Sequence, residues 1–207
     1  MSNKQNTFHP QTAKFLAVLA ENILGGLSTE MMQYWIENPK SLQEHLKFLL
    51  DKSGRVLTSL ISSIHVDGAK EFKSADFFTT SNKSVKIVYL GNTFKSNFLE
   101  KIELDIPSAD IKIHDLLKDS LDPRIISELG QNYETSLYDI VELLKLQPNG
   151  GRGLLLTNGC ANVFYIRDKN NGLWAVSLRW YGGGWRFEAD SVGDAYSWGV
   201  GSQIVSR

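Results

Sequence analysis

The segment that most constrains the fold is the sequence from residue 147 to residue 207, which is rich in glycine and tryptophan. It holds eleven of the 17 glycines and four of the 5 tryptophans. Asn-Gly, a strong signal for a tight turn, occurs three times here. Between the turns, apolar and polar residues alternate with period two, as in strands with one buried face. The segment therefore predicts a C-terminal antiparallel β-meander of three to five strands.

One hairpin of this meander can be predicted to the residue. A two-residue turn at Gly182-Gly183 pairs Trp180 with Trp185, and it also pairs Arg179 with Arg186. An aromatic pair contributes about 0.5–1.5 kcal/mol, which exceeds the small repulsion between exposed like charges. The alternative register gives one arginine a glutamate partner but leaves a tryptophan in the loop. We favour the first register, in which most of the tryptophans lie in the core.

The first 54 residues predict three amphipathic helices. Apolar residues recur at helical spacing, and the helices end at Gly25-Gly26, Asn38-Pro39 and Gly54. A capping box formed by Ser41 and Glu44 begins the third. The apolar run near the N-terminus is interrupted by polar residues and lacks a clean cleavage site, so we interpret it as a helix and predict a cytoplasmic protein. No stretch approaches the roughly 20 apolar residues of a membrane span.

The middle of the chain mixes strand and helix signals. Residues 55–66 fit either element, because their apolar residues have helical spacing while their β-branched and serine content favours a strand. Of the two, we favour a strand that enters a mixed sheet. Residues 84–90 alternate and predict a strand. Residues 122–130 predict a helix that an aspartate caps and a glycine ends. Ser136 and Asp139 predict the capping box of another helix.

Together these patterns predict an α+β fold, with N-terminal and central helices and a C-terminal antiparallel β-meander. The change in composition divides a mostly helical part, residues 1–146, from a Gly/Trp-rich sheet, residues 147–207. The same change is also compatible with two layers of one domain. A chain of 207 residues can bury a core without disulfides, and its single cysteine excludes an internal one.

No complete catalytic or metal-binding motif is present in the sequence. His65 and Asp67 would share one face of a strand, but a zinc site needs three or four ligands, so we predict no metal and no cofactor. Cys160 follows a turn, yet the sequence ties no base to it. A small hydrolase or transferase, with a site assembled from His65, Asp67, His114 and Cys160, is therefore the second functional hypothesis.

The first hypothesis is a non-catalytic binding module that uses the Gly/aromatic loops of the C-terminal sheet. Tyr196 and Trp198 lie in a glycine-flanked loop, where Trp198 is expected to be exposed for contact. Arg179 would lie on a sheet face with Tyr165 and Tyr181 nearby, where these residues could stack on bases or contact an acidic partner. The net charge of -1 and the acidic residues between the arginines argue against nucleic acid and membranes. The predicted partner is another protein.

Several stretches of the chain resemble a family of uncharacterised bacterial proteins. They include residues 89–103 and 112–130, and the likeness is densest at 157–168 and 201–207. It extends over roughly residues 65–207. The resemblance implies no activity, cofactor or catalytic residue, and it supports only the predicted boundary and the meander.

Overall fold

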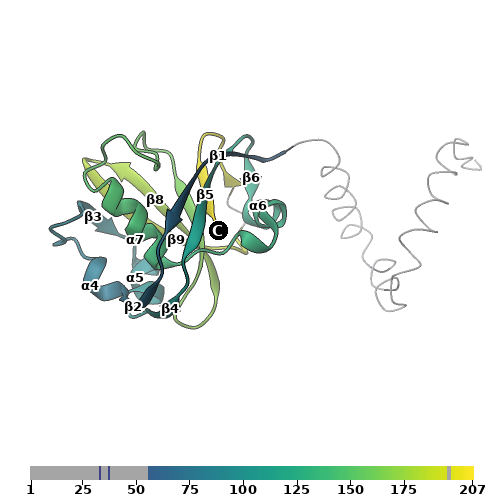
Figure 1. Cartoon of the computed structure of the whole chain (residues 1–207). Coiled ribbons are helices and arrows are strands. Elements are labelled where there is room, and N and C mark those ends of the chain that lie inside the picture. Colours follow the sequence, from purple (N-terminus) through teal and green to yellow (C-terminus); the bar gives the residue numbers. More distant parts are fainter. Residues whose placement is uncertain (1–32, 34–36, 38–55, 195–196) are drawn as a thin grey trace, which may run out of the picture. The chain divides into compact units, whose positions relative to one another are not determined.

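The computed structural model describes Gln33, Glu37 and residues 56–194 and 197–207 (Figure 1). Contacts within the chain define two units, residues 1–55 and residues 56–207. The fold described below is that of the second unit. The three helices predicted before residue 55, apart from the helical residues Gln33 and Glu37, lie outside the described residues, and so does Tyr196.

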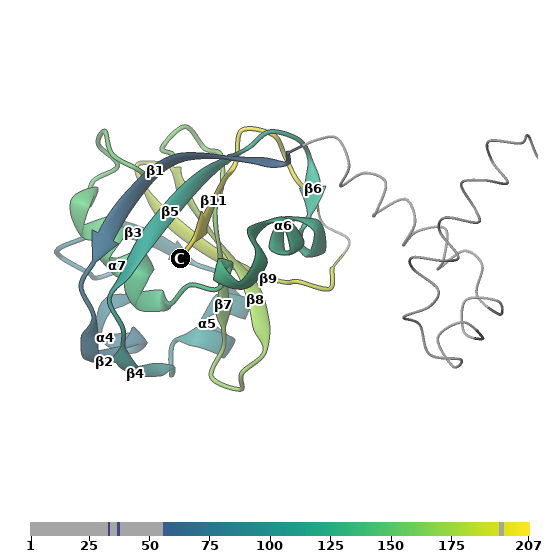
Figure 2. The ribbon, with the colours of Figure 1, turned by 45° about the vertical axis from the view of Figure 1, so that its right-hand side comes forward.

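A seven-stranded mixed sheet forms the centre of this unit, in the order β1-β5-β11-β7-β8-β9-β3 (Figures 1 and 2). Two neighbouring pairs, β11 with β7 and β3 with β9, are parallel, and the other neighbours are antiparallel. The strands are β1 (Thr58–Val66), β3 (Ile87–Leu90), β5 (Ala109–Leu116), β7 (Asn162–Arg167), β8 (Leu173–Tyr181), β9 (Gly184–Ser191) and β11 (Gln203–Ser206).

Two small sheets and several short helices surround the large sheet. One small sheet pairs β2 (Ala69–Lys73) with β4 (Ile102–Ile106), and the other pairs β6 (Ser120–Leu121) with β10 (Ser197–Trp198). The helices are α4 (Ser74–Phe77), α5 (Asn92–Phe98), α6 (Asp122–Leu129), the 3-10 turn η2 (Gly130–Asn132) and α7 (Leu137–Leu146).

The two faces of the sheet carry separate apolar clusters. The larger cluster takes its buried side chains from α5, α7 and one face of the strands. The smaller cluster takes them from α6, β10 and the opposite face of β5, β7, β8 and β11. Figures 1 and 2 show α5 and α7 grouped together and α6 apart from them. The central strand β7 is buried along most of its length because it is covered on both faces.

The predicted α+β fold with N-terminal and central helices and a C-terminal antiparallel β-meander is wrong, because the described chain is built on one mixed sheet. β7, β8 and β9 do form consecutive antiparallel neighbours, but β11 lies between β5 and β7 and runs parallel to β7. β1, β3 and β5, which all precede residue 147, complete the same sheet. The change in composition at residue 147 therefore falls inside one compact unit. Alternation within a strand carries no information about which distant strand it pairs with.

Several local predictions are confirmed. Residues 55–66 contain the strand β1, residues 84–90 contain β3, and the helices α6 and α7 lie within the segments predicted to be helical. The hairpin register is also confirmed, because Trp180 pairs with Trp185 and Arg179 pairs with Arg186. The two tryptophan rings pack edge to face with centroids 5.3 Å apart.

The prediction that the hairpin tryptophans belong to the core is confirmed. Trp185 is 0% exposed, and Trp198, which was predicted to be exposed, is also buried. Trp174 and Trp180 are partly buried and pack against the larger cluster. The hairpin therefore directs its indoles to one face. The opposite face of β8 carries Leu173 and Ala175, which belong to the smaller cluster, and polar side chains nearer the turn.

Asp122 does not have the capping role that the sequence predicted. α6 begins at this residue without a side-chain cap. The Asp122 carboxylate instead accepts two hydrogen bonds on Oδ1, from the Tyr165 hydroxyl at 2.8 Å and from Trp198 Nε1 at 2.6 Å. Because Tyr165 and Trp198 are both buried, Asp122 satisfies two polar groups inside the smaller apolar cluster.

The capping box of α7 gives a first testable prediction. Ser136 Oγ accepts from the Asp139 backbone N–H at 3.1 Å, and Asp139 Oδ2 accepts from the Ser136 N–H at 2.8 Å. Ser136→Ala is expected to lower the free energy of unfolding by about 1–2 kcal/mol, because a helix N-terminal donor loses its acceptor. Urea denaturation measures this loss. The exposed Ser108→Ala should stay within about 0.5 kcal/mol of wild type, and an equal loss in both variants would contradict the capping role.

Candidate functional site

The four residues of the proposed hydrolase or transferase site do not come together at one place in the structure. His65 is exposed at the end of β1, with Nδ1 2.8 Å from Asp110 Oδ1 and Nε2 3.8 Å from Asp67 Oδ1. His65 is directly opposite Asp110, whereas His114 lies four residues further along β5. At the rise of a strand, four residues span about 13 Å. The structure thus brings His65 and Asp67 together but leaves His114 at a distance.

His114 and Cys160 contact neither His65 nor Asp67, and each lies in its own environment. His114 Nε2 lies 3.0 Å from Ser206 Oγ, and burial together with Lys112 lowers the pKa of His114. Cys160 is partly buried in the turn before β7. In the described part of the chain, no hydrogen bond or ion pair joins either residue to His65 or Asp67. Among the described residues, no group of three or more His, Cys, Asp or Glu side chains lies close enough together to hold a metal ion.

Trp198 is not the exposed contact residue that the sequence predicted. Its ring is 1% exposed, within β10, and its Nε1 donates to Asp122. The glycines on both sides suggested a free loop, but the pairing of Trp198 with Ser120 fixes the segment against β6. The other two predicted binding residues do lie on the surface. Tyr181 is 67% exposed, and Arg179 is partly exposed.

Arg179 and Tyr181 belong to a larger group on one face of the sheet. Arg186 lies directly opposite Arg179 in the β8–β9 pair, and Tyr89 lies opposite Arg186 in the β3–β9 pair. Because residues opposite one another point to the same face, all four side chains share it. We call Tyr89, Arg179, Tyr181 and Arg186 the arginine–tyrosine surface. It faces away from the larger apolar cluster, and no residue of β3 or β9 contributes to the smaller cluster within the described chain.

The turn of the hairpin fixes the geometry of this surface. Gly182 and Gly183 both have positive φ, 63° and 77°, as a two-residue hairpin turn requires. This turn sets the register that places the two arginines opposite each other. The guanidinium of Arg186 lies 4.3 Å from the centre of the Tyr89 ring. A cation held over an aromatic face gains about 0.5–1 kcal/mol at an exposed site, so Tyr89 orients Arg186.

Among the described residues, Arg179 and Arg186 interact with Glu188 only through their charges, which oppose the rise in its pKa. Arg179 Nη1 lies 3.4 Å from the Gly159 carbonyl oxygen. Within the described residues, neither guanidinium forms an ion pair with an aspartate or glutamate. Two like charges directly opposite each other in a sheet repel, and natural sheets more often pair opposite charges at such positions. The surface therefore concentrates positive charge beside two exposed tyrosine rings.

Glu188 is the nearest acidic neighbour along β9, and its carboxylate lies against Gly91. It packs against Gly91, where an added Cβ would come within 2.1 Å of Glu188 Oε2. Burial and the neighbouring Asp190 raise the pKa of Glu188, while Arg186 and Arg179 oppose this shift. Burial and Asp194 likewise raise the pKa of Asp190. Glu188 and Asp190 thus form an acidic strip on β9 that begins two residues after Arg186 along the strand.

Tyr89 and Arg186 were not among the residues predicted to bind. The hairpin pattern in the sequence does place Arg186 opposite Arg179, but by itself this pairing indicates only a small repulsion between two exposed charges. Tyr89 is brought to the site by the parallel pairing of β3 with β9, which joins segments about a hundred residues apart. No local pattern in the sequence encodes that pairing.

The chain matches no protein-family model, no curated protein and no solved structure. The resemblance to an uncharacterised bacterial family therefore stays a prediction. Among the described residues, no helix is both long enough and apolar enough to cross a membrane.

Proposed function

We propose that the protein is a non-catalytic binding module whose arginine–tyrosine surface holds an acidic segment of another protein. The observation that carries this proposal is that Arg179 and Arg186 lie opposite each other and, among the described residues, form no ion pair with a carboxylate. A bound carboxylate would replace their repulsion with two charge-assisted hydrogen-bonded contacts. Guanidinium groups bind carboxylates in a planar, two-bond geometry, which makes arginine well suited to this role.

The flanking tyrosines support a peptide as the ligand. Tyr181 is 67% exposed and Tyr89 is 37% exposed, so both rings offer apolar area with a polar hydroxyl. Tyrosine and arginine are the residue types enriched at the energetic centres of protein interfaces. These four side chains therefore provide both the charge and the contact area for a short segment.

The acidic strip favours a short protein segment over a nucleic acid. Glu188 and Asp190 follow Arg186 on the same face of β9, so a long polyanion that ran along the strand would meet negative charge. Each step of two residues along a strand covers about 7 Å, which limits the attractive region to the hairpin end. A few carboxylates fit this region, whereas a nucleic-acid backbone needs a continuous basic track.

The binding test compares two double variants with the same change of net charge. The probe is a fluorescent hexaglutamate peptide with a blocked N-terminus and an amidated C-terminus. Arg179→Gln/Arg186→Gln is expected to weaken binding at least tenfold, because the paired guanidinium groups are lost. Lys70→Gln/Lys95→Gln, at exposed positions elsewhere, should remain within twofold of wild type. Fluorescence anisotropy at low and physiological salt measures both, and binding should weaken with salt.

Two outcomes would overturn the proposal. Equal weakening in the two double variants would show that net charge, rather than this surface, attracts the probe. Tight binding of a single-stranded oligonucleotide without binding of the peptide would assign the surface to nucleic acid.

A further inference from the structure

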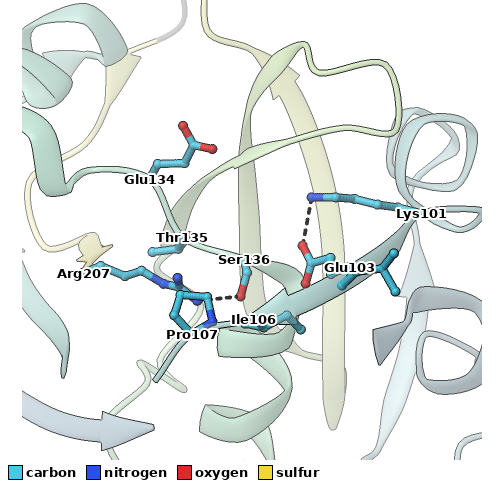
Figure 3. A pocket seen from close by; sticks show the side chains of 9 residues that line it. Lys101, Glu103, Ile106, Pro107, Glu134, Thr135, Ser136 and Arg207 are labelled. Atoms are coloured by element: carbon cyan, nitrogen blue, oxygen red, sulfur yellow. Dashed lines mark hydrogen bonds and ion pairs between the residues drawn. The ribbon is translucent and has the colours of Figure 1, made fainter. Parts of the chain in front are cut away.

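A pocket on another part of the molecule lies beside β4. Its volume is about 390 Å³, within the range of ligand-binding cavities. Its walls come from β4 and the adjoining Lys101 and Pro107, from residues 134–136 before α7, and from Arg207 after β11 (Figure 3). None of these residues belongs to the arginine–tyrosine surface, so the pocket is a separate site.

The free edge of β4 borders this pocket. Within the described chain, β4 pairs only with β2, which leaves the hydrogen-bonding groups of its other edge without a strand partner. Glu103, Leu104 and Ile106 all line the cavity. Adjacent residues of a strand point to opposite faces, so a cavity that touches both sets lies along the edge of the strand. An unpaired edge is a template for an added strand.

Lys101 supplies a fixed positive charge at one end of the pocket. Its Nζ lies 2.8 Å from Glu103 Oε1 and donates to the Arg167 carbonyl oxygen at 2.6 Å. Glu103 in turn accepts from the backbone N–H groups of Leu137 and Tyr138, both at 3.0 Å, in the first turn of α7. A lysine ammonium has three N–H donors, so one has no partner in the described part of the chain.

Arg207 supplies a second fixed cation on the opposite side. Its Nε and Nη2 donate to the two carboxylate oxygens of Asp139, both at 2.8 Å, and Nη2 also donates to Ser136 Oγ at 3.1 Å. The Asp139 side chain is 1% exposed, whereas that of Arg207 is 21% exposed. The two N–H donors on Nη1 of Arg207 have no partner among the described residues. Figure 3 shows Arg207 and Lys101 on opposite sides of Ser136 and Glu103.

We infer that this pocket binds the carboxyl-terminal end of an extended peptide. The peptide backbone adds to the free edge of β4, and the terminal carboxylate accepts the remaining N–H donors of Lys101 or Arg207. The Leu104 side chain, which is 66% exposed, packs against the peptide. A peptide amino terminus is disfavoured, because Glu103 already accepts three donors and Glu134 is paired with Arg167 at 3.0 Å.

The charged walls need no rearrangement to receive this ligand. Each cation is already oriented by at least two contacts, so its side-chain entropy has been lost on folding rather than on binding.

Asp105, in the middle of β4, has a positive φ of 47°, which is uncommon outside glycine. This bend lies between Leu104 and Ile106, where the strand lines the pocket.

The test uses two pools of acetylated, sequence-randomised pentapeptides that differ only at the C-terminus, as free acid or as amide. Addition of the acid pool is expected to shift the backbone amide signals of Leu104 and Ser136 in ¹H–¹⁵N spectra. The amide pool should bind at least tenfold more weakly, because it lacks the carboxylate. Equal binding of both pools, or no shift at these residues with either pool, would overturn the inference.

Two variants on β4 locate the site without disturbing the buried ion pairs. Leu104→Glu introduces a negative charge at the pocket and should weaken binding of the acid pool at least tenfold. Ile102→Glu makes the same change two residues earlier on the strand, at a side chain that is 52% exposed and does not line the pocket. It should stay within twofold of wild type. Equal losses in both variants would place binding elsewhere, and neither result bears on the hexaglutamate test.

Discussion

Trp185→Ala is expected to lower the free energy of unfolding by about 3–5 kcal/mol. The Trp185 side chain is 0% exposed, and it lies in the larger apolar cluster between β8 and β3. Its Nε1 donates to the Gln147 carbonyl oxygen at 3.2 Å, and its ring packs edge to face on Trp180. The substitution therefore leaves a large cavity and removes an aromatic contact. It also removes one hydrogen bond to the Gln147 carbonyl oxygen, which still accepts from the Gly150 N–H at 3.3 Å.

Chemical denaturation followed by circular dichroism measures this loss. Tyr181→Ala, in the same hairpin, provides the matched control, because the Tyr181 side chain is 67% exposed. It should change the free energy of unfolding by no more than about 0.5 kcal/mol. A small effect of Trp185→Ala would mean that the indole is not packed in the core.

Asp122→Ala is the second change with a large expected effect, a loss of about 2–6 kcal/mol. The Asp122 carboxylate is the acceptor for both the Tyr165 hydroxyl and Trp198 Nε1, and all three residues are buried. Each buried donor left without an acceptor costs about 1–3 kcal/mol. Asp122→Asn retains one oxygen at this position and is expected to preserve most of the stability. Thermal and urea unfolding at neutral pH compare the two variants.

The Asp122→Asn variant also has a defined pH dependence relative to wild type. Burial raises the pKa of Asp122, with Asp190 and Asp194 adding to the shift and the bonds from Trp198 and Tyr165 opposing it. The folded protein therefore holds this proton more tightly than the unfolded chain, whose aspartates titrate near about pH 4. The resulting stabilisation is complete below that pH and is lost as pH rises through the folded pKa.

Asparagine carries no such proton, so the two proteins should diverge with pH. The stability of Asp122→Asn relative to wild type should increase as pH rises from about 4 towards neutral. Glu188 and Asp190 titrate in both proteins, and the comparison cancels their contributions to first order. A stability difference that is constant with pH, or that changes in the opposite direction, would contradict a raised pKa for Asp122.

The sequence predicted those parts of the fold that depend on neighbouring residues. The Gly182-Gly183 turn and the alternation on both sides of it determined the pairing of Trp180 with Trp185, which is local in the chain. The capping box of Ser136 and Asp139 likewise lies within four residues and forms as predicted. In both cases the residues that make up the sequence pattern are also the residues that contact one another in the structure.

The sequence did not predict the contacts between distant segments. β11 enters the sheet between β5 and β7, and β3 joins the edge of β9, without any pattern that specifies these partners. The wrong prediction for Trp198 has the same cause. Contacts with the distant strand β6 and with Asp122 bury this residue, although glycines flank it in the sequence. The same cause explains why only half of the arginine–tyrosine surface was identified beforehand.

The most direct test of the proposed function observes the two arginines themselves. In ¹H–¹⁵N spectra of the guanidinium groups, titration with the amidated hexaglutamate should shift the Nε–Hε signals of Arg179 and Arg186 together, with one apparent affinity. The Arg152 signal, from an exposed residue outside this surface, should remain unchanged. Equal shifts at all three arginines, or shifts at Arg152 alone, would contradict recognition of an acidic segment by the arginine pair.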